Sequence, residues 1–537
     1  MSKKMSILLL LLLSVCLMSL PFLVPGTGFL ALIGLVPLLF AEQLASEAGI
    51  RRFFWWHYLC FVAWNFATTF WVCNATVGGG IFATLANALQ MSVIFGLFRW
   101  SKKHLKGSLP YIFLAFAWIA WERYYLAWAQ ISWPWLVLGN AFARTTSWIQ
   151  WYEFTGTLGG SLWIWASNLA VFGILMSSKT GNWKRFNAKA KTAVVLGTAL
   201  LFLAPPAVSL FLRPEEPSGS LDVFIAQPNI DVYGKHGGMT QQDQNDRLLS
   251  QFSAAPADST ILLIGPETFT NDVITNDPSV SVTVDRFSRF LAGRPNSSML
   301  VGATSFEYIR SAIKPSHTAR QRGKDTWVES HNSALMLTAG EEPQIFHKNK
   351  LVVGVEMTPY PAFFCPIDDK LGGVMGRCIG TGHASNLYFP VRDSSGAVTR
   401  SIPVGCAICY ESVYGEYCTE YVRKGAELLT VITNDAWWGD TPGYRQHLSY
   451  ACLRAIETRR WIARCGNTGI SAIIDPSGRI IKHSSWWQQE TLSGQVGLSD
   501  EQTFYVRHGD YIGRISVLMF LLLLCGTIVK RLTTCTQ

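Results

Sequence analysis

Apolar residues crowd the first 212 positions of the chain and return in one run near its end, whereas the stretch between them mixes apolar and polar residues. In the apolar parts, runs of about 20 residues are separated by short polar turns, and a helix of about 20 residues is long enough to cross a bilayer core. The pattern therefore predicts a transmembrane helical domain over residues 1–212, with about seven spans, and one further span near the carboxyl terminus. The predicted spans are residues 5–24, 28–46, 54–74, 80–98, 109–130, 157–176, 192–212 and 511–529.

Between these parts the pattern changes to short apolar runs separated by polar segments. Residues 213–220 contain prolines, serines and a glycine and are predicted to form a linker. Residues 221–230 resemble a strand ending in a turn, and a polar helix is predicted to follow through about residue 254. Buried strands then alternate with helical or irregular stretches, which predicts an α/β domain over residues 221–510. These strands are predicted near residues 261–265, 299–303, 333–338, 403–409 and 428–433.

Two long stretches of the α/β domain, residues 306–331 and 357–400, are polar or rich in glycine and proline and have no clear period. Loops of this length in a compact domain are usually functional lids or disordered. The second stretch contains Cys365 and Cys378, which could form a disulfide in an oxidising compartment, although spacing alone does not fix the connectivity. Cysteines and histidines of the domain lack the spacing of metal ligands, so no metal site is predicted.

Composition and charge agree with a membrane protein and indicate its orientation. Only 15% of the 537 residues are charged, against about 25% in soluble proteins. Lys3 and Lys4 precede the first apolar run, but no small-residue cleavage site follows, so an uncleaved span is expected. Lysine and arginine concentrate in alternate loops, which places those loops in the cytoplasm and residues 213–510 outside it. The formal net charge of +9 is partly explained by these loops and does not indicate a nucleic-acid partner.

Residues 403–411, with the sequence PVGCAICYE, contain a candidate nucleophile. The apolar run is typical of a buried strand that ends on Cys409 and continues into polar residues, which would place a thiol at the rim of a sheet. Small cysteines are also common packing residues, so Cys406 and Cys409 could belong to an ordinary core. The chemical interpretation of Cys409 therefore depends on the residues that accompany it.

Two upstream stretches each bring a charged residue to the end of an apolar run. Residues 261–267, ILLIGPE, place Glu267 beyond a strand interrupted by Gly-Pro, where a carboxylate could act as the base for a thiol. Residues 346–353, FHKNKLVV, offer Lys348, a cation that could hold an oxyanion and lower the pKa of the thiol. The three residues together indicate a Glu-Lys-Cys catalytic set.

Histidines raise the alternative of a Cys-His pair. The candidates are His347, His383 and His447. His347 lies next to Lys348 within the same short motif, and His447 opens a predicted helix whose pattern indicates packing. We therefore do not expect a histidine to be the catalytic base.

The order Glu, Lys, Cys along an α/β pattern resembles the nitrilase or carbon-nitrogen hydrolase superfamily. The matching motifs are GPE at 265–267, HKNKL at 347–351 and CYE at 409–411. Further motifs resemble one branch of that superfamily, the apolipoprotein N-acyltransferases, which are integral membrane enzymes of lipoprotein maturation. Those motifs are TNDAWWGD at 433–440, QH at 446–447, RAIE at 454–457 and GNTGISAIIDPSGRI at 466–480. The resemblance spans nearly the whole chain.

The resemblance implies a fold, a site and a location. The fold would be a multi-span α-helical membrane domain with an α/β nitrilase-like domain, a four-layer α-β-β-α sandwich. Glu267, Lys348 and Cys409 would be catalytic, no cofactor would be needed, and the catalytic domain would lie in the periplasm of a bacterium, anchored in the inner membrane. The residues that match substrate-binding or supporting positions are Glu356, Glu411, Tyr410, Asn332 and Trp437. Of these, Glu356 and Glu411 would orient Lys348 or an amine.

The same resemblance implies transfer of a fatty acyl chain from the sn-1 position of a phospholipid to the α-amino group of the N-terminal diacylglyceryl-cysteine of an apolipoprotein. The reaction would be ping-pong through a thioester on Cys409, and the protein is expected to be a monomer. A membrane-tethered amidase acting on a small amide fits the Glu-Lys-Cys set equally well, but eight spans exceed what tethering needs. A non-enzymatic receptor or scaffold is disfavoured because all three residues are intact.

Two segments of the α/β domain depart from the family pattern. Residues 351–356 are LVVGVE where the family usually has LVPFGE, so Glu356 is kept but the preceding glycine and the proline are lost. The mobility of this loop could differ as a result. Residues 235–236 are Lys-His where many members have Lys-Trp, so an aromatic substrate contact would come from Tyr233 or elsewhere.

One predicted span carries two charged residues, Glu122 and Arg123. Charges inside a span usually pair with each other or face a cavity, so we expect these two to contact each other or a polar headgroup. The SWPWLVLG segment at 132–139 resembles a family segment, but the spacing of the family's arginine is not clearly kept. A substrate role for Arg123 is therefore not carried over.

Overall fold

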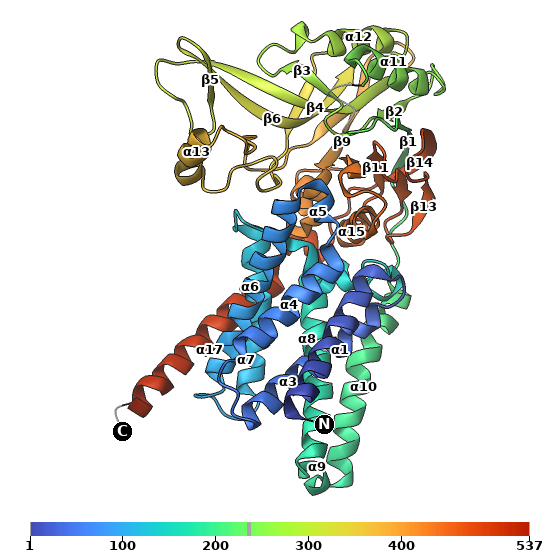
Figure 1. Cartoon of the computed structure of the whole chain (residues 1–537). Coiled ribbons are helices and arrows are strands. Elements are labelled where there is room, and N and C mark those ends of the chain that lie inside the picture. Colours follow the sequence, from blue (N-terminus) through green and yellow to red (C-terminus); the bar gives the residue numbers. More distant parts are fainter. Residues whose placement is uncertain (1, 233–237, 536–537) are drawn as a thin grey trace. The chain divides into compact units, whose positions relative to one another are not determined.

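The computed structural model describes residues 2–232 and 238–535, which form two compact units (Figure 1). A membrane unit comprises Met1–Arg213 and His508–Gln537, and an α/β unit comprises Pro214–Arg507. Each unit has its own buried apolar residues and is described by itself.

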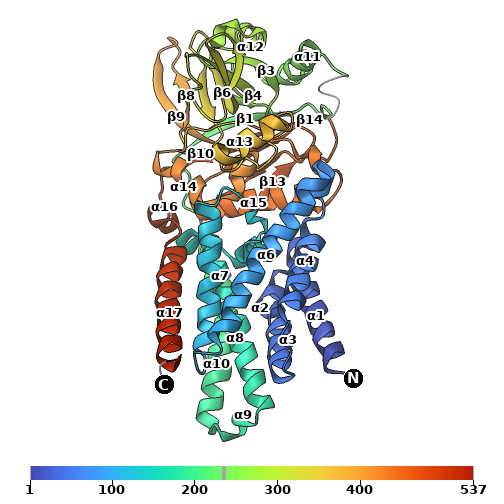
Figure 2. The same cartoon turned by 60° about the vertical axis from the view of Figure 1, so that its left-hand side comes forward.

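The membrane unit consists of long helices with short connections (Figure 2). Within the described ranges, six helical segments are long and apolar enough to cross a membrane. They are α1 (Lys3–Leu23), Gly28–Glu47 with α2 (Ala31–Gly34) and α3 (Val36–Glu47), α6 (Val77–Ser101), α8 (Tyr152–Lys179), α10 (Ala188–Phe211) and α17 (Tyr511–Cys535). Short helical pieces complete the unit: α5 (Val72–Ala75), α9 (Asn182–Arg185) and the 3-10 turns Gly28–Leu30, Pro134–Leu136, Leu138–Phe142 and Thr146–Trp148.

Helices also occupy the two remaining predicted spans, although they fall outside that set of six. Helix α4 (Phe54–Thr69) has only 16 residues, and α7 (Leu109–Ala127) carries Glu122 and Arg123. Helix α7 packs against α17, so the carboxyl-terminal span is part of the same helical bundle as the amino-terminal spans (Figure 2).

Glu122 and Arg123 of α7 make different contacts. Glu122 is fully buried and accepts hydrogen bonds from the Leu138 backbone N (2.8 Å) and Trp118 Nε1 (3.2 Å). The Arg123 guanidinium lies 5.0 Å from the centre of the Trp128 ring, a cation–π contact. The Glu122 side chain thus links α7 to the turn at Leu138. Its partner inside the span is a backbone N–H group.

The α/β unit contains two sheets. The first has the strand order β14-β1-β2-β4-β6-β5, with β3 beside β4 and β7 beside β6. The second has the order β13-β12-β11-β10-β9-β8. The strands of the first sheet are β1 (Gly219–Gln227), β2 (Ile261–Ile264), β3 (Thr270–Ile274), β4 (Ser297–Arg310), β5 (Arg320–Gly323), β6 (Thr326–Thr338), β7 (Gln344–His347) and β14 (Glu490–Leu498). Those of the second are β8 (Leu387–Arg392), β9 (Val398–Ile408), β10 (Leu428–Thr433), β11 (Ile462–Gly466), β12 (Ala472–Ile474) and β13 (Ile480–His483).

Helices cover the outer faces of the two sheets (Figure 1). Helices α11 (Gln241–Phe252) and α12 (Val282–Ala292) pack on the first sheet through an apolar cluster that includes Leu248, Phe287 and Val301. Helix α14 (Gly415–Arg423) packs on β9 of the second sheet and on α15 (Pro442–Thr458). Strand pairs such as β1 and β11 bring the sheets face to face. The expected α-β-β-α sandwich is confirmed. Two further α-helices of this unit are α13 (Pro361–Lys370) and α16 (Phe504–His508).

The two stretches expected to be lids or disordered contain regular structure. Strands β4 and β6 continue as an antiparallel pair as far as Arg310 opposite Thr326, and β5 pairs beside them. The second stretch contains α13 and β8. In the β4–β6 hairpin, residues 306–310 of β4 are all partly or fully exposed, so this part of the sequence lacks the alternation that a half-buried strand shows. Cys365 and Cys378 are free, so the disulfide considered for them is not formed.

Candidate active site

Cys409 follows the last residue of β9, where the chain turns out of the sheet. Its backbone has φ = 51°, a left-handed conformation that a non-glycine residue adopts only when its surroundings hold it there. Glu411 supports the turn, because its Oε2 accepts a hydrogen bond from the Ile408 backbone N (2.9 Å). Cys409 as a residue is partly exposed at the end of a parallel strand, the edge of the sheet from which a substrate would approach.

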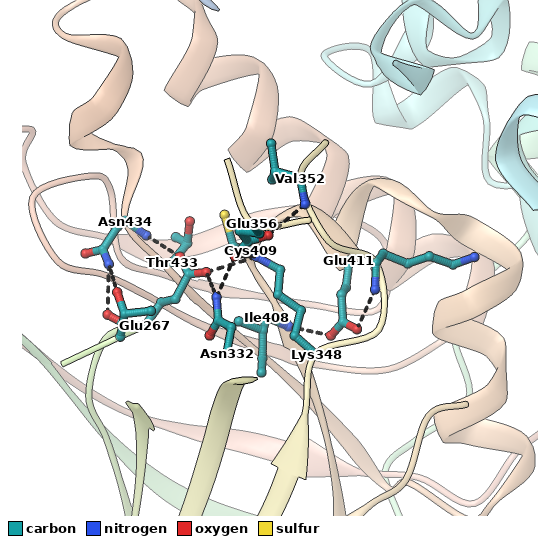
Figure 3. Close-up of polar contacts among 12 residues, drawn as sticks. Glu267, Asn332, Lys348, Val352, Glu356, Ile408, Cys409, Glu411, Thr433 and Asn434 are labelled. Atoms are coloured by element: carbon teal, nitrogen blue, oxygen red, sulfur yellow. Dashed lines mark hydrogen bonds and ion pairs between the residues drawn. The ribbon is translucent and has the colours of Figure 1, made fainter. Parts of the chain in front are cut away.

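Glu267 and Lys348 meet beside Cys409 (Figure 3). The Lys348 Nζ lies 3.0 Å from Glu267 Oε1 and 2.8 Å from Glu356 Oε1. Asn332 Nδ2 donates to the same two oxygens, at 2.8 and 2.7 Å. Lys348 is 1% exposed and Glu267 is 5% exposed, so water screens this pair little. Glu267 lies in the loop after β2, Asn332 lies within β6, and Lys348 and Glu356 follow β7.

The second oxygen of Glu267 is also held. Its Oε2 accepts from the Asn434 backbone N (3.1 Å), and Asn434 Nδ2 donates to the Glu267 carbonyl (2.8 Å) and to Thr268 Oγ1 (2.8 Å). Asn434 follows β10, which is the parallel neighbour of β9. The two sheets therefore meet at this carboxylate, and its orientation is fixed from both sides.

The electrostatics of the site keep the thiol protonated and the lysine charged. Burial and the Glu267 carboxylate raise the pKa of Cys409 well above the usual range, while Lys348 opposes this shift. Burial lowers the pKa of Lys348, but Glu267 and Glu356 outweigh that effect and hold the pKa well above its usual range. A base is consequently needed to form the thiolate. The charged Lys348 amine is positioned to stabilise an oxyanion that develops during the reaction.

Comparisons with known proteins place this site in a family. The family model "Carbon-nitrogen hydrolase" matches residues 240–505, and the model "Apolipoprotein N-acyltransferase N-terminal domain" matches residues 14–170. An apolipoprotein N-acyltransferase of Chlorobaculum tepidum is 29% identical over 498 residues, which cover 90% of this chain and 89% of the relative. The chain belongs to the apolipoprotein N-acyltransferase family. It is an acyltransferase with a nitrilase-like domain, as the sequence motifs predicted.

Other relatives extend the similarity. The apolipoprotein N-acyltransferase of Geobacter metallireducens is 28% identical over 523 residues, covering 93% of this chain and 91% of the relative. Among solved structures, Saccharomyces cerevisiae Nit3, a member of branch 10 of the nitrilase superfamily, matches with a TM-score of 0.36 and 15% identity. That match covers 55% of this chain and 96% of Nit3.

The two glutamates that were expected to support the site of this acyltransferase differ in position. Glu356 joins the Lys348 group, and its Oε2 also accepts from the Val352 backbone N (2.7 Å). Glu411 lies on the other side of the nucleophile turn and accepts from the Asn349 backbone N (2.7 Å). Glu411 therefore joins the loop after Lys348 to the turn that carries Cys409, whereas Glu356 contacts the lysine amine directly.

Tyr410 and Trp437, which were also expected near the substrate, differ in exposure. Tyr410 is 5% exposed and its ring packs edge-on against Tyr414, with ring centres 5.2 Å apart. Trp437, in the 3-10 turn Asp435–Trp438, is 39% exposed and available to a substrate at the surface. Tyr233, considered as an aromatic substrate contact, lies outside the described residues.

Sequence reasoning missed Asn434 and Thr433, although both lie in the TNDAWWGD motif that carried the family resemblance. Thr433 hydrogen-bonds the Cys409 thiol and lowers its pKa in part, against the larger effect of burial. The signal that could have found them was their position directly after β10, the strand next to the one that ends at the nucleophile. Over the described ranges, no group of three metal-ligating side chains comes together.

Proposed function

We propose that the chain transfers a fatty acyl group from the sn-1 position of a phospholipid to the α-amino group of the diacylglyceryl-cysteine at the amino terminus of an apolipoprotein. The observation that carries this proposal is the buried Glu267–Lys348 pair beside Cys409, in a chain whose other unit is a helical membrane domain of the acyltransferase family. The relatives are named apolipoprotein N-acyltransferases, and this name supports an apolipoprotein as the acyl acceptor.

The first half-reaction forms a thioester. Glu267 takes the proton from Cys409 Sγ, and the thiolate attacks the carbonyl carbon of the sn-1 ester. The oxyanion of the tetrahedral intermediate is stabilised by Lys348 Nζ and a backbone amide. The C–O bond then breaks, Glu267 returns its proton to the departing sn-1 oxygen, and a lysophospholipid leaves with the acyl chain now on Cys409.

The second half-reaction forms the amide. The neutral α-amine of the diacylglyceryl-cysteine attacks the thioester carbonyl, and Glu267 takes a proton from the amine. Collapse of the intermediate breaks the C–S bond, and the proton on Glu267 returns to the sulfur. The enzyme is restored, and the two products leave at different times, which is the ping-pong pattern.

The proposed donor position and acceptor can be tested with the full chain reconstituted in phospholipid vesicles. A phospholipid labelled in its sn-1 acyl chain and a synthetic diacylglyceryl-cysteine peptide should give labelled, N-acylated peptide, and an sn-2 label should not. Transfer of the sn-2 label would refute the donor assignment. Steady hydrolysis of a small amide with no peptide acylation would favour the membrane-tethered amidase, which the Glu-Lys-Cys set alone also fits.

The proposed topology places the α/β unit on the periplasmic face of the inner membrane, where lipid donor and lipoprotein acceptor meet. Basic residues in alternate loops support it. A reporter that is active only outside the cytoplasm should therefore work when fused after Ser220 and fail when fused after Lys184. Inactivity of the Ser220 fusion with activity of the Lys184 fusion would reverse the orientation and remove the proposed site of action.

Helix α13 supports a direct contact of the α/β unit with lipid. Phe363, Ile367 and Leu371 follow one another at helical spacing, and their side chains are 65%, 43% and 73% exposed. An apolar helix face exposed in this way is suited to lie in the interfacial region of a bilayer. Phe364, the next residue, is only partly exposed and packs edge-on against Phe363, with ring centres 4.9 Å apart.

Replacing Phe363 by serine should slow acyl transfer from bilayer phospholipid by about tenfold or more, because the variant loses most of the transfer free energy of one aromatic side chain, about 1.5–3 kcal/mol. Transfer from a short, water-soluble ester should change little. Val282→Ser, a matched control at a 73% exposed position of α12, should affect neither donor. Equal losses on both donors would mean that Phe363 only packs the α13 segment.

A further inference from the structure

The strained turn at Cys409 needs partners that hold its carbonyl group. The Cys409 O accepts a hydrogen bond from Ser412 Oγ (2.7 Å), and His447 Nε2 lies 3.0 Å from the same oxygen. Ser412 Oγ and His447 Nε2 are themselves 2.9 Å apart. The carbonyl next to the nucleophile is therefore enclosed by a serine and a histidine that come from different elements, the 3-10 turn Cys409–Val413 and α15.

The histidine ring is oriented by a carboxylate. Asp435 Oδ1 lies 2.9 Å from His447 Nδ1, and Asp435 Oδ2 accepts from Arg464 Nη2 at 2.5 Å. Nδ1 faces Asp435 Oδ1 and also lies 3.1 Å from Arg464 Nη2, and these contacts turn Nε2 toward Cys409 and Ser412. Because a carbonyl oxygen can only accept hydrogen bonds, His447 holds the Cys409 carbonyl through an N–H at Nε2. The charge of Asp435 is balanced by Arg464, so the group can be fully buried.

The same carboxylate also reaches the sulfur side of the nucleophile. Thr433 Oγ1 donates to Asp435 Oδ1 (2.9 Å), and the same hydroxyl oxygen accepts a hydrogen bond from the Cys409 thiol. Asp435 is thus connected to Cys409 by two routes, through His447 to the carbonyl oxygen and through Thr433 to the sulfur. We call Ser412, Thr433, Asp435, His447 and Arg464 the Asp435 network, and all five residues are 0% exposed.

We propose that the Asp435 network positions the nucleophile: Asp435 and His447 hold the Cys409 carbonyl, and Thr433 orients the sulfur toward Glu267 and Lys348. This inference deepens the proposed function and rests on Cys409 being its nucleophile. His447 is a positioning residue and not the base, because it acts on the backbone of Cys409 from a fully buried position. On the other side of the turn, Glu411 accepts a hydrogen bond from the Ile408 backbone N. The peptide groups before and after the nucleophile are therefore both held by hydrogen bonds.

Glutamine and asparagine at position 447 separate the two functions of the histidine ring. A glutamine amide nitrogen can occupy the place of Nε2 and contact the Cys409 carbonyl, whereas an asparagine amide nitrogen can occupy the place of Nδ1 and contact only Asp435. His447→Gln should retain most activity. His447→Asn should lower kcat by about 10²-fold, the loss expected when a reacting atom is misplaced by about 1 Å. The KM for phospholipid should not change, because the network does not contact the donor.

A second pair of variants tests the sulfur side without any substrate. Iodoacetamide alkylates the thiolate, so the rate of Cys409 alkylation against pH, followed by mass spectrometry on the purified full chain, reports the ionisation of the thiol. Once the thiolate forms, the Thr433 hydroxyl can turn from Asp435 and donate to the sulfur, and that hydrogen bond favours the thiolate. Thr433→Val should therefore shift the alkylation profile to higher pH, and Thr433→Ser, which keeps the hydroxyl, should not.

These measurements have outcomes that decide the proposal. Equal kcat values for folded His447→Gln and His447→Asn would refute the positioning role of His447. If neither folds, as judged by thermal unfolding, the Thr433 pair decides, and identical alkylation profiles for Thr433→Val and Thr433→Ser would refute the network. The alkylation profile needs neither lipid nor lipoprotein, so failure of the proposed acyl transfer would not affect this test.

Discussion

Cys409→Ser is expected to reduce acyl transfer by about 10⁴-fold or more, the scale seen when a covalent nucleophile is removed. The hydroxyl of serine has a far higher pKa than a thiol, and the Glu267 carboxylate is too weak a base to ionise it. The loss should appear in the first half-reaction, as an absence of acyl-enzyme, while the protein is still produced and inserted in the membrane. Acyl transfer from labelled phospholipid to a diacylglyceryl-cysteine peptide measures it.

Cys406→Ser is the matched control, because Cys406 lies three residues earlier, within the strand β9 that leads to Cys409. Cys406 is 0% exposed inside the strand, whereas Cys409 is partly exposed beside Glu267 and Lys348, so Cys406 is a packing residue and not a nucleophile. The Cys406 variant should keep near-normal transfer with a modest loss of thermal stability. An inactive Cys406→Ser together with an active Cys409→Ser would show that the nucleophile has been assigned to the wrong cysteine.

Loss of Lys348 should have the second large effect. Lys348→Ala is expected to slow both half-reactions by about 10²-fold, the usual cost of removing an oxyanion donor. It also leaves Glu267 and Glu356 facing each other without the cation between them, so the variant should be less stable as well. Single-turnover rates of acyl-enzyme formation and of transfer to the peptide separate the two steps. A loss confined to one step would contradict a shared oxyanion site.

Glu267→Gln distinguishes a base from a mere charge at the same position. The carboxylate of Glu267 raises the pKa of Cys409, so removing its charge should lower the thiol pKa and shift alkylation by iodoacetamide to lower pH. Acyl-enzyme formation should nevertheless fall sharply, because the group that moves the proton to the leaving oxygen has been lost. Normal acyl-enzyme formation in Glu267→Gln would remove Glu267 from that role.

The catalytic candidates could be found from sequence because each stands where an apolar run ends. Glu267 and Cys409 follow β2 and β9, and Lys348 follows β7, so strand ends alone placed the three residues at sheet edges. Which of these residues contact each other depends on the tertiary structure. The bond between Asn434 N and Glu267 joins residues far apart in the chain, and no local pattern predicts it.

The contacts of His447 illustrate the same limit. From its helix pattern the residue was expected to pack, and its ring is indeed fully buried. The sequence could not reveal that the buried ring reaches the Cys409 carbonyl, since that depends on how α15 lies against the nucleophile turn. Burial and a site function are therefore compatible when the side chain acts on the backbone of a catalytic residue.

In the membrane unit, hydropathy predicted where the helices lie, but it did not predict their lengths or the contacts of their polar residues. Helix α4 is shorter than the span expected there, and a separate short helix, α5, follows it. Asn65 and Thr68 of α4 are fully buried and bond to carbonyl groups of their own helix, so the polarity that weakens the hydropathy signal is satisfied inside the bundle. Glu122 of α7 is accommodated in the same way, by the Leu138 backbone N.

The central claim, that Cys409 carries the acyl group between a phospholipid and an amine, is tested most directly by the mass of the peptide that contains Cys409. The full chain is incubated in phospholipid vesicles without an acceptor, digested, and analysed before and after treatment with neutral hydroxylamine, which cleaves thioesters. We predict the mass of one fatty acyl chain on Cys409, lost on treatment with hydroxylamine and lost when a diacylglyceryl-cysteine peptide is added. An unmodified Cys409, or an acyl group on another residue, would contradict the account.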